Sequence, residues 1–277
     1  VGCQNGENES ESGGNEVEGG SESLPCISNC PNIEWIHIDG GTYMMGSPDG
    51  VGENNEHPQH QVTVPSFEAM KTEVTVGMYR TCVDAGVCSE DELTVSDYGD
   101  NQNCNWNYMN RENHPINCVD WSQARTFAQW VGGDLCSESM WEYMARSGGQ
   151  DITYPWGDET ATCTYAIMDD GGNGCGEDRT WPVCSKTAGN SDQGLCDLSG
   201  NVWEWVLDLY VSNYNNAPTD GSPVCETPTC DLSTSDRLFR GGGWRGSSEF
   251  LRATYRVYNT PGIRVYDLGF RVCRTNP

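Results

Sequence analysis

Fifteen cysteines, spread from Cys3 to Cys273, constrain this chain of 277 residues more than any other feature of its sequence. Their spacings do not fit a zinc site, because paired CxxC motifs are missing and the chain has only four His. We therefore expect disulfides, which form and persist in oxidising compartments. The sequence predicts an extracytoplasmic protein, at the cell surface or secreted, whose fold is held by several bridges.

An odd number of cysteines leaves one without a partner, and Cys3 is the candidate. Val1-Gly2-Cys3 resembles the end of a bacterial lipobox, in which the cysteine carries the lipid. This interpretation predicts a bacterial lipoprotein that reaches the membrane only through its anchor and keeps its other cysteines for disulfides. The alternative is that Cys3 is a disulfide partner or a free thiol.

The composition divides the chain into a tail and one folded domain. Residues 1–24 consist mainly of Gly, Ser, Asn and Glu, with few side chains to bury. Such a segment cannot repay the entropy of ordering itself, so we expect a flexible acidic spacer. Residues 25–277 have a globular composition and form the expected domain.

The net charge of −26 argues against nucleic acid as a partner, because phosphates would be repelled. No run of residues approaches the ~18 apolar residues of a membrane-spanning helix. The charge is unevenly placed, since eight Arg lie between Arg237 and Arg274 against only two acidic residues. We expect most of these Arg to pair with carboxylates elsewhere in the fold.

Local patterns predict short strands and two short helices. Residues 33–39 and 61–65 alternate in the manner of strands. Asp120, with Gln123 three residues later, predicts a capped helix that ends at Gly132-Gly133. Residues 137–146 predict a second helix, and the glycines beyond it indicate loops.

Ten motifs occur in a characteristic order along residues 33–274. They are Gly41–Ser47, His60–Val64, Glu73–Thr75, His114–Trp121, Gly133–Ser137, Trp141–Tyr143, Tyr154–Asp158, Gly194–Trp205, Arg240–Trp244 and Leu268–Val272. In this order they resemble the formylglycine-generating-enzyme (sulfatase-modifying factor) family. The resemblance implies an α+β, C-type-lectin-like fold that is rich in loops, with few short helices and short antiparallel strands.

The resemblance also implies where catalysis would occur. In the family's enzymes, two cysteines after the Gly-Gly motif bind copper and activate oxygen. Here that segment, Gly243–Leu251, contains no thiol, and copper(I) needs soft thiolate ligands. We therefore expect a protein without copper that is not an enzyme of this kind, and a divergent enzyme is the least favoured alternative.

A structural calcium ion is a second implication of the resemblance. In the enzymes, oxygen atoms around the asparagine-tryptophan-glutamate loop hold this ion. The equivalent positions here are the side chains of Asp197 and Glu204 and the backbone carbonyls of Gly200 and Val202. Hard oxygen ligands of this kind suit calcium. The alternative is that the two carboxylates only cap backbone groups and pair with Arg.

Three cysteine pairs are disulfide candidates. Cys82 with Cys88 and Cys225 with Cys230 are close enough in sequence to staple loops, although spacing does not fix connectivity. Cys136 stands where the family has a proline, and Cys273 follows the expected final strand. We expect these two cysteines to join the second helix to the C-terminus.

The favoured function is a non-catalytic extracellular or cell-surface binding module whose ligand is an unidentified molecule or protein. Aromatic and Arg side chains dominate recognition surfaces, and the family's active-site region would supply them here. The candidate surface comprises Trp244, Arg245, Ser247, Ser248, Glu249, Phe250, Tyr255, Tyr258 and Tyr266, although some of its aromatic residues are also candidates for the core. The alternative is a structural subunit that forms a calcium-stabilised surface assembly or filament, a homo-polymer.

Overall fold

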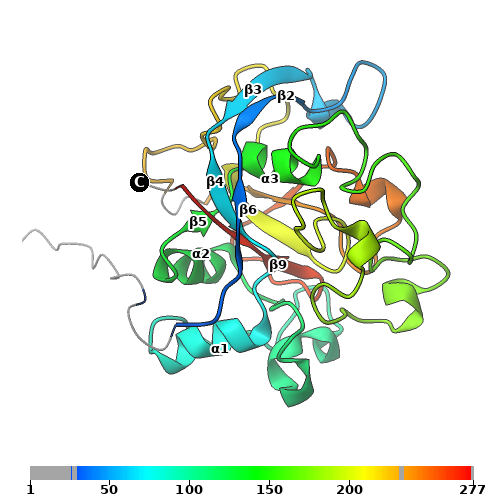
Figure 1. The fold of residues 1–277 in the computed structure, drawn as a ribbon. Helices are drawn as coiled ribbons and strands as arrows, with labels where there is room; N and C mark the ends of the chain where they lie inside the picture. Colours follow the sequence, from blue (N-terminus) through cyan, green and yellow to red (C-terminus); the bar gives the residue numbers. More distant parts are fainter. Residues whose placement is uncertain (1–25, 27–29, 231–233, 276–277) are drawn as a thin grey trace, which may run out of the picture.

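The computed structural model describes residues 26, 30–230 and 234–275 (Figure 1). Its helices are α1 (Val76–Asp84), α2 (Trp121–Trp130) and α3 (Glu138–Ala145). Its strands are β1 (Trp35–Ile38), β2 (Gly41–Met45), β3 (His60–Val64), β4 (Phe67–Met70), β5 (Asp134–Leu135), β6 (Trp203–Leu209), β7 (Arg237–Arg240), β8 (Val257–Asn259), β9 (Leu268–Phe270) and β10 (Val272–Arg274). The expected α+β class with few helices and short strands is confirmed.

The strands form three small sheets. One has the order β1-β4-β10-β5, the second is the hairpin β2-β3, and the third has the order β8-β7-β6-β9. Pairing is antiparallel except between β6 and β9, where Trp203 lies opposite Leu268 in a parallel register. Because β9 and β10 follow one another directly, the C-terminal segment links the first and third sheets.

Side-chain caps fix where the helices begin. The Asp120 carboxylate accepts the amide hydrogen of Gln123 at 2.8 Å, and the Gln123 side chain accepts that of Asp120 at 3.2 Å. This capping box begins α2 where the sequence predicted it. The Ser137 hydroxyl caps α3 by accepting the amide hydrogen of Met140. Helix α1 was not predicted from the sequence, and Thr75 caps it by accepting the amide hydrogen of Met78.

Aromatic side chains are the largest members of the core. Trp121, Phe127 and Trp205 are fully buried between α2 and the sheets. A second cluster packs Trp141 of α3 against the β2-β3 hairpin and β6. Figure 1 shows α2 and α3 lying on either side of the central strands. Large aromatic areas compensate for the low share of apolar residues.

Fourteen cysteines form seven disulfides. The pairs are Cys26–Cys30, Cys82–Cys88, Cys104–Cys118, Cys136–Cys273, Cys163–Cys175, Cys184–Cys196 and Cys225–Cys230. The three expected pairs are among them. Cys3 and the tail of residues 1–24 lie outside the described residues. Seven disulfides are consistent with an oxidising compartment.

The C-terminal arginines pair with carboxylates, as the sequence predicted. Seven of the eight Arg between Arg237 and Arg274 form ion pairs with Asp or Glu. Arg237 packs on the Trp121 ring and donates to the carbonyl of Leu207. In the described part of the chain, no helix is long and apolar enough to cross a membrane.

A group of buried ion pairs forms a network between α3 and the third sheet. We call Glu138, Glu142, Arg146, Arg240 and Arg256 the arginine network. Arg240 lies 3.0 Å from Glu138 and 2.6 Å from Glu142, and both its partners are buried. Arg256 contacts Glu138, while Arg146 contacts Glu142 at 2.9 Å. This network joins the helix to the third sheet through charge-assisted hydrogen bonds.

Candidate functional site

The loop that follows β7 shapes the region where the resemblance placed the active site. Gly241 and Gly242 have φ angles of 97° and 77°, which L residues rarely adopt. At Gly243 a β-carbon would lie 2.8 Å from the Asp267 carboxylate, so a side chain there would collide with it. The glycines therefore let the loop lie directly against the start of β9.

An aromatic cluster lies beside this loop. The ring of Trp203 is 6.5 Å from that of Phe250 and 6.2 Å from that of Tyr255. Phe250 and Tyr255 also contact each other, at 5.1 Å in an edge-to-face arrangement. All three side chains are half-buried, so part of each ring remains accessible.

Arg245 and Tyr266 extend the accessible surface. The Arg245 guanidinium donates to the Tyr266 hydroxyl at 2.7 Å and to Asp100 at 3.1 Å. It also lies 5.0 Å from the centre of the Tyr266 ring. Burial raises the pKa of the neighbouring Asp267 to about 6, which Arg245 partly opposes. We call Trp203, Arg245, Phe250, Tyr255 and Tyr266 the aromatic face.

The structure corrects part of the predicted surface. Trp244 is fully buried, and its indole donates to the Tyr266 carbonyl at 3.3 Å. It therefore packs beneath Tyr266 in the core and is not part of the accessible surface. Tyr258 is exposed but stacks on Tyr210 instead of contacting Trp203. Ser247 and Glu249 are exposed, and Ser248 is half-buried. The segment forms a short 3-10 helix, Ser248–Leu251, without a thiol.

Two residues of this region escaped the sequence analysis. Trp203 lies within the motif Gly194–Trp205 but was not assigned to the surface. The alternation of side chains along a strand could have indicated its position. Successive residues of β6, such as Trp203 and Glu204, point to opposite faces of the sheet. Asp267 directly precedes the motif Leu268–Val272, but its contact with Gly243 depends on the folded loop.

The predicted calcium ligands lie in a buried group of like charges. Glu73, Asp197 and Glu204 surround one cation, Arg271, and we call these four residues the acid cluster. Both oxygens of Glu204 accept hydrogen bonds from Arg271, at 2.6 and 2.7 Å. Trp141 donates a third hydrogen bond to Glu204, at 2.7 Å. Asp197 accepts the amide hydrogen of Cys184 at 2.6 Å. The alternative stated above, capping and pairing with Arg, therefore describes these contacts.

Glu73 is the member that its neighbours do not satisfy. No donor reaches its buried Oε1 atom, and its Oε2 atom accepts only from Asn201, at 3.4 Å. Its remaining side-chain hydrogen bond is with Asp197, and it needs a proton on one of the two carboxyl groups. Burial and the charges of Asp197 and Glu204 raise the pKa of Glu73 well above its ordinary range. Three carboxylates around one guanidinium leave two negative charges when all are ionised, and an uncompensated buried charge is costly.

The negative charge of the acid cluster favours a divalent cation, but the number of side chains available as ligands does not. An ion of charge +2 would balance the cluster and give Glu73 Oε1 a partner. Among the residues that the structure describes, however, no three Cys, His, Asp or Glu side chains converge as a metal site. A cation here would depend on backbone oxygens as well, which the resemblance assigned to Gly200 and Val202.

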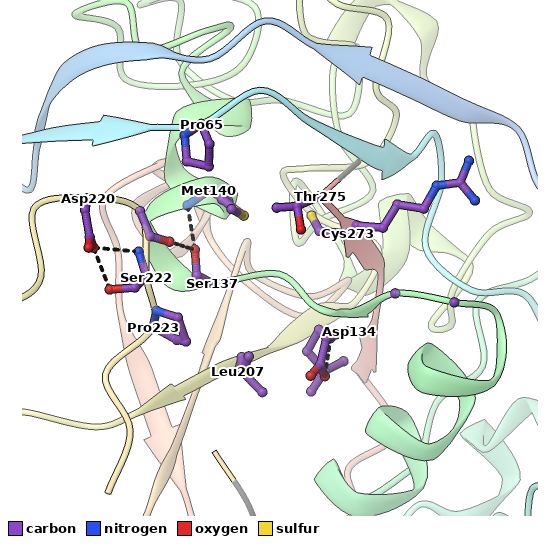
Figure 2. Close-up of a pocket in the computed structure, with 15 residues that line it drawn as sticks. Pro65, Asp134, Ser137, Met140, Leu207, Asp220, Ser222, Pro223, Cys273 and Thr275 are labelled. Carbon is purple, nitrogen blue, oxygen red and sulfur yellow. Dashed lines mark hydrogen bonds between the residues drawn. The ribbon is translucent and has the colours of Figure 1, made fainter. Parts of the chain in front are cut away.

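A cavity of about 530 Å³ lies apart from these groups, between the beginning of α3 and the C-terminal strand (Figure 2). Ser137, Met140, Asp220, Ser222 and Cys273 are among its lining residues. Its polar groups are largely occupied, since Asp220 accepts from the Ser222 amide and hydroxyl, and Ser137 donates to the Gly221 carbonyl. The sequence analysis missed it, because its walls come from five distant segments.

Comparison with known proteins shows the family. The model of the sulfatase-modifying factor enzyme 1-like domain matches residues 26–276. The formylglycine-generating enzyme of Mus musculus is 26% identical over 85% of this chain and 73% of its own length. Serine/threonine-protein kinase pkn1 of Chlamydia caviae is 28% identical over 87% of this chain. The chain spans only 38% of the length of that kinase.

Solved structures agree with the sequence comparison. The structure of PvdO from Pseudomonas aeruginosa superposes with a TM-score of 0.73 at 27% identity, covering 91% of this chain and 97% of PvdO. The family model matches nearly all the described residues, and the fold agrees over the same range. The chain therefore belongs to the sulfatase-modifying factor enzyme 1-like family.

Proposed function

We propose that this chain is a non-catalytic binding module that works outside the cytoplasm and recognises its ligand through the aromatic face. The non-catalytic part of the proposal rests on the bonding of the cysteines. All fourteen described cysteines are bridged, and the segment Gly243–Leu251 has none. The described residues therefore offer no thiolate pair for copper.

The composition of the face supports recognition. Half-buried aromatic rings provide contact area at a low entropic cost, and an exposed Arg supplies directional hydrogen bonds. Arg245 is held ready by Asp100 and Tyr266, so little side-chain freedom is lost on binding. The loop of Gly241–Gly243, which lies close against Asp267, holds the face in place.

Two measurements test the proposal. In the first, the protein is given copper(I) and a cysteine-containing peptide, and oxygen consumption is followed with an electrode. We expect no uptake above the rate without protein, and sustained turnover would contradict the non-catalytic assignment.

In the second, arrays of peptides and glycans are probed with the wild type and with the double variant Arg245→Ala/Phe250→Ala. We expect signals that the double variant loses. The control is Met109→Ala, because Met109 is the most exposed large apolar side chain described, at 75%. Signals that persist in the double variant would place recognition elsewhere.

We further propose that the acid cluster holds a structural calcium ion. Asp197 and Glu204 would supply side-chain oxygens and Gly200 and Val202 backbone oxygens, with Glu73 as an additional carboxylate. The orphaned Glu73 oxygen supports the proposal. Calorimetry of the chelator-treated protein should show calcium binding, and no heat of binding would contradict it. Light scattering before and after calcium addition tests the alternative role, since a large rise in mass would favour a homo-polymer.

A further inference from the structure

Three aromatic rings in and near the motif Tyr154–Asp158 stack on one another. The centres of the Tyr154 and Trp156 rings are 4.9 Å apart, and their planes differ by 2°. The Trp156 and Tyr165 rings have the same separation, and their planes differ by 7°. All three planes are therefore nearly parallel. We call Tyr154, Trp156 and Tyr165 the ring stack, and it shares no residue with the aromatic face.

The ring stack begins in the core and ends at the surface. Tyr154 is buried and donates its hydroxyl hydrogen to the Ser248 carbonyl at 3.0 Å. The Trp156 indole donates to the Glu159 carbonyl at 2.9 Å. Trp156 packs against the apolar cluster that contains Tyr154, whereas the half-buried Tyr165 is not part of that cluster. Tyr165 is therefore the outer ring, and its neighbours hold it in a fixed plane.

One face of the Tyr165 ring has no aromatic or cationic partner. The other face packs against Trp156, and the hydroxyl donates to Glu159 Oε2 at 2.9 Å in an exposed hydrogen bond. Within the described ranges, no second ring and no Lys or Arg is recorded over Tyr165. Other rings of this protein are covered by an arginine guanidinium 3.9–4.2 Å from the ring centre, namely Trp35, Trp106, Tyr108 and Trp121. Tyr165 lacks the partner that these rings have.

Carboxylates surround this end of the ring stack. Residues 150–178 contain seven Asp or Glu and no Lys or Arg. The Glu159 carboxylate bonds to Tyr165 itself, and Asp170 accepts the amide hydrogen of Cys163, two residues before Tyr165, at 3.0 Å. Both carboxylates are exposed. The members of the seven that form ion pairs in the described chain are Asp151 and Glu177. Glu159 and Asp170 are thus uncompensated.

These charges select the class of partner. The face of an aromatic ring is negative, so it attracts a cation and disfavours an anion. The two uncompensated carboxylates act in the same direction, and the net charge of −26 favours the approach of a basic partner over a longer range. A planar guanidinium fits a flat ring better than an ammonium does, because it stacks on the ring while its N–H groups bond to carboxylates at its edge.

We propose that the open face of Tyr165 receives an arginine side chain of a partner protein, with Glu159 and Asp170 as its negative partners. The guanidinium would continue the ring stack in the way that arginines of this chain cover Trp35 and Tyr108. The site goes beyond the proposed function, since it needs neither the aromatic face nor a calcium ion.

The test follows the Trp156 indole by proton–nitrogen NMR while N-acetylarginine amide is added at constant ionic strength. The indole ring contacts Tyr165, so its signal reports on the ring stack. We expect a saturable shift with the arginine compound and weaker binding of N-acetyllysine amide. A shift that stays linear in concentration, or lysine binding as tight as arginine binding, would overturn the proposal.

Two variants of Tyr165 separate the ring from its hydroxyl. Tyr165→Ala removes the plane on which the guanidinium stacks, and the dissociation constant should rise about fivefold, the value of one exposed cation–π contact. Tyr165→Phe keeps the plane and releases Glu159 from its hydrogen bond, so it should bind at least as well as the wild type. An unchanged dissociation constant in Tyr165→Ala, or an equal loss in both variants, would contradict stacking.

A third variant and a control complete the design. Glu159→Gln removes one charge but keeps the shape, and it should weaken binding about tenfold. It keeps the test valid if Tyr165→Ala does not fold, and unchanged binding would remove Glu159 from the site. The matched control is Tyr98→Ala, because Tyr98 is 60% exposed and its hydroxyl accepts from the Asn259 amide at 3.0 Å. Tyr98→Ala should leave the titration unchanged, and an equal weakening there would mean that the binding is not specific to the ring stack.

Discussion

The arginine network and the acid cluster contain the same kinds of side chain in opposite proportions. Three arginines share two carboxylates in the network, whereas three carboxylates share one arginine in the cluster. Burial alone would raise the pKa of Glu138, yet Arg256 and Arg240 lower it below its ordinary value. At Glu73, burial acts together with Asp197 and Glu204, and the pKa rises well above the ordinary range. The network is thus complete within the fold, whereas the cluster needs a proton or a bound cation. The four predictions that follow test this difference.

The largest effect is expected from removing the central cation of the network. Arg240→Met leaves Glu138 and Glu142 buried with one fewer partner each. Removing one partner of a buried pair costs about 3–5 kcal/mol, because the other charge stays desolvated. Urea unfolding at pH 7 measures the loss. A loss under about 1 kcal/mol would show that the two regions do not differ as described.

A smaller effect, of opposite sign, is expected in the cluster. Without calcium, Glu73→Gln should stabilise the fold by about 1–2 kcal/mol, because the raised pKa of Glu73 makes folding at pH 7 depend on the uptake of a proton, which an amide of the same shape does not need. The same variant should lose most of any stabilisation by calcium. Melting temperatures with calcium and with a chelator give both quantities. An unchanged calcium response would remove Glu73 from the proposed site.

The third prediction concerns the edge of the network. Burial and the charge of Glu138 raise the pKa of Asp208 from 3.8 to about 7. Between these two values the folded state keeps a proton that the unfolded state releases, so stability falls as pH rises through that window. The expected fall is at most about 1.4 kcal/mol for each pH unit within that window. Asp208→Asn should flatten this part of the stability profile, and an unchanged slope would contradict the assignment.

The smallest effect is expected from an exposed pair of the same chemistry. Lys71 lies 3.0 Å from Glu34, with side chains 33% and 63% exposed. Lys71→Ala should cost less than about 1 kcal/mol, and salt should reduce the cost further. Urea unfolding at low and high salt measures it. A cost similar to that of Arg240→Met would mean that burial does not determine how much stability is lost when an ion pair is broken.

Local signals in the sequence were sufficient for the elements that depend on neighbouring residues. The capping box of Asp120 and Gln123 and the cap at Ser137 fixed the starts of α2 and α3, because a cap acts within one turn. The same kind of signal existed at Thr75 for α1 but was not used. The disulfide between Cys136 and Cys273 was predicted from the family resemblance and not from the spacing of the cysteines.

What depends on contacts between distant segments could not be predicted. Glu73 enters the acid cluster from a segment more than a hundred residues before Asp197, so its role appears only after folding. Tryptophan is a residue type that is common in binding sites, but the burial of Trp244 depends on how the glycine loop packs against β9. A cavity beside Trp181 likewise combines the segment 177–182 with His114.

The disulfide between Cys136 and Cys273 determines what a single proteolytic cut does to the protein. It closes a ring through 137 positions of sequence, and shorter bridges subdivide that ring. A protease that cuts one peptide bond within the ring opens it, but both ends remain covalently attached. Nicked molecules would migrate as intact ones on a non-reducing gel and separate only after reduction. A single cut in an exposed loop of this ring would therefore damage the protein without dividing it.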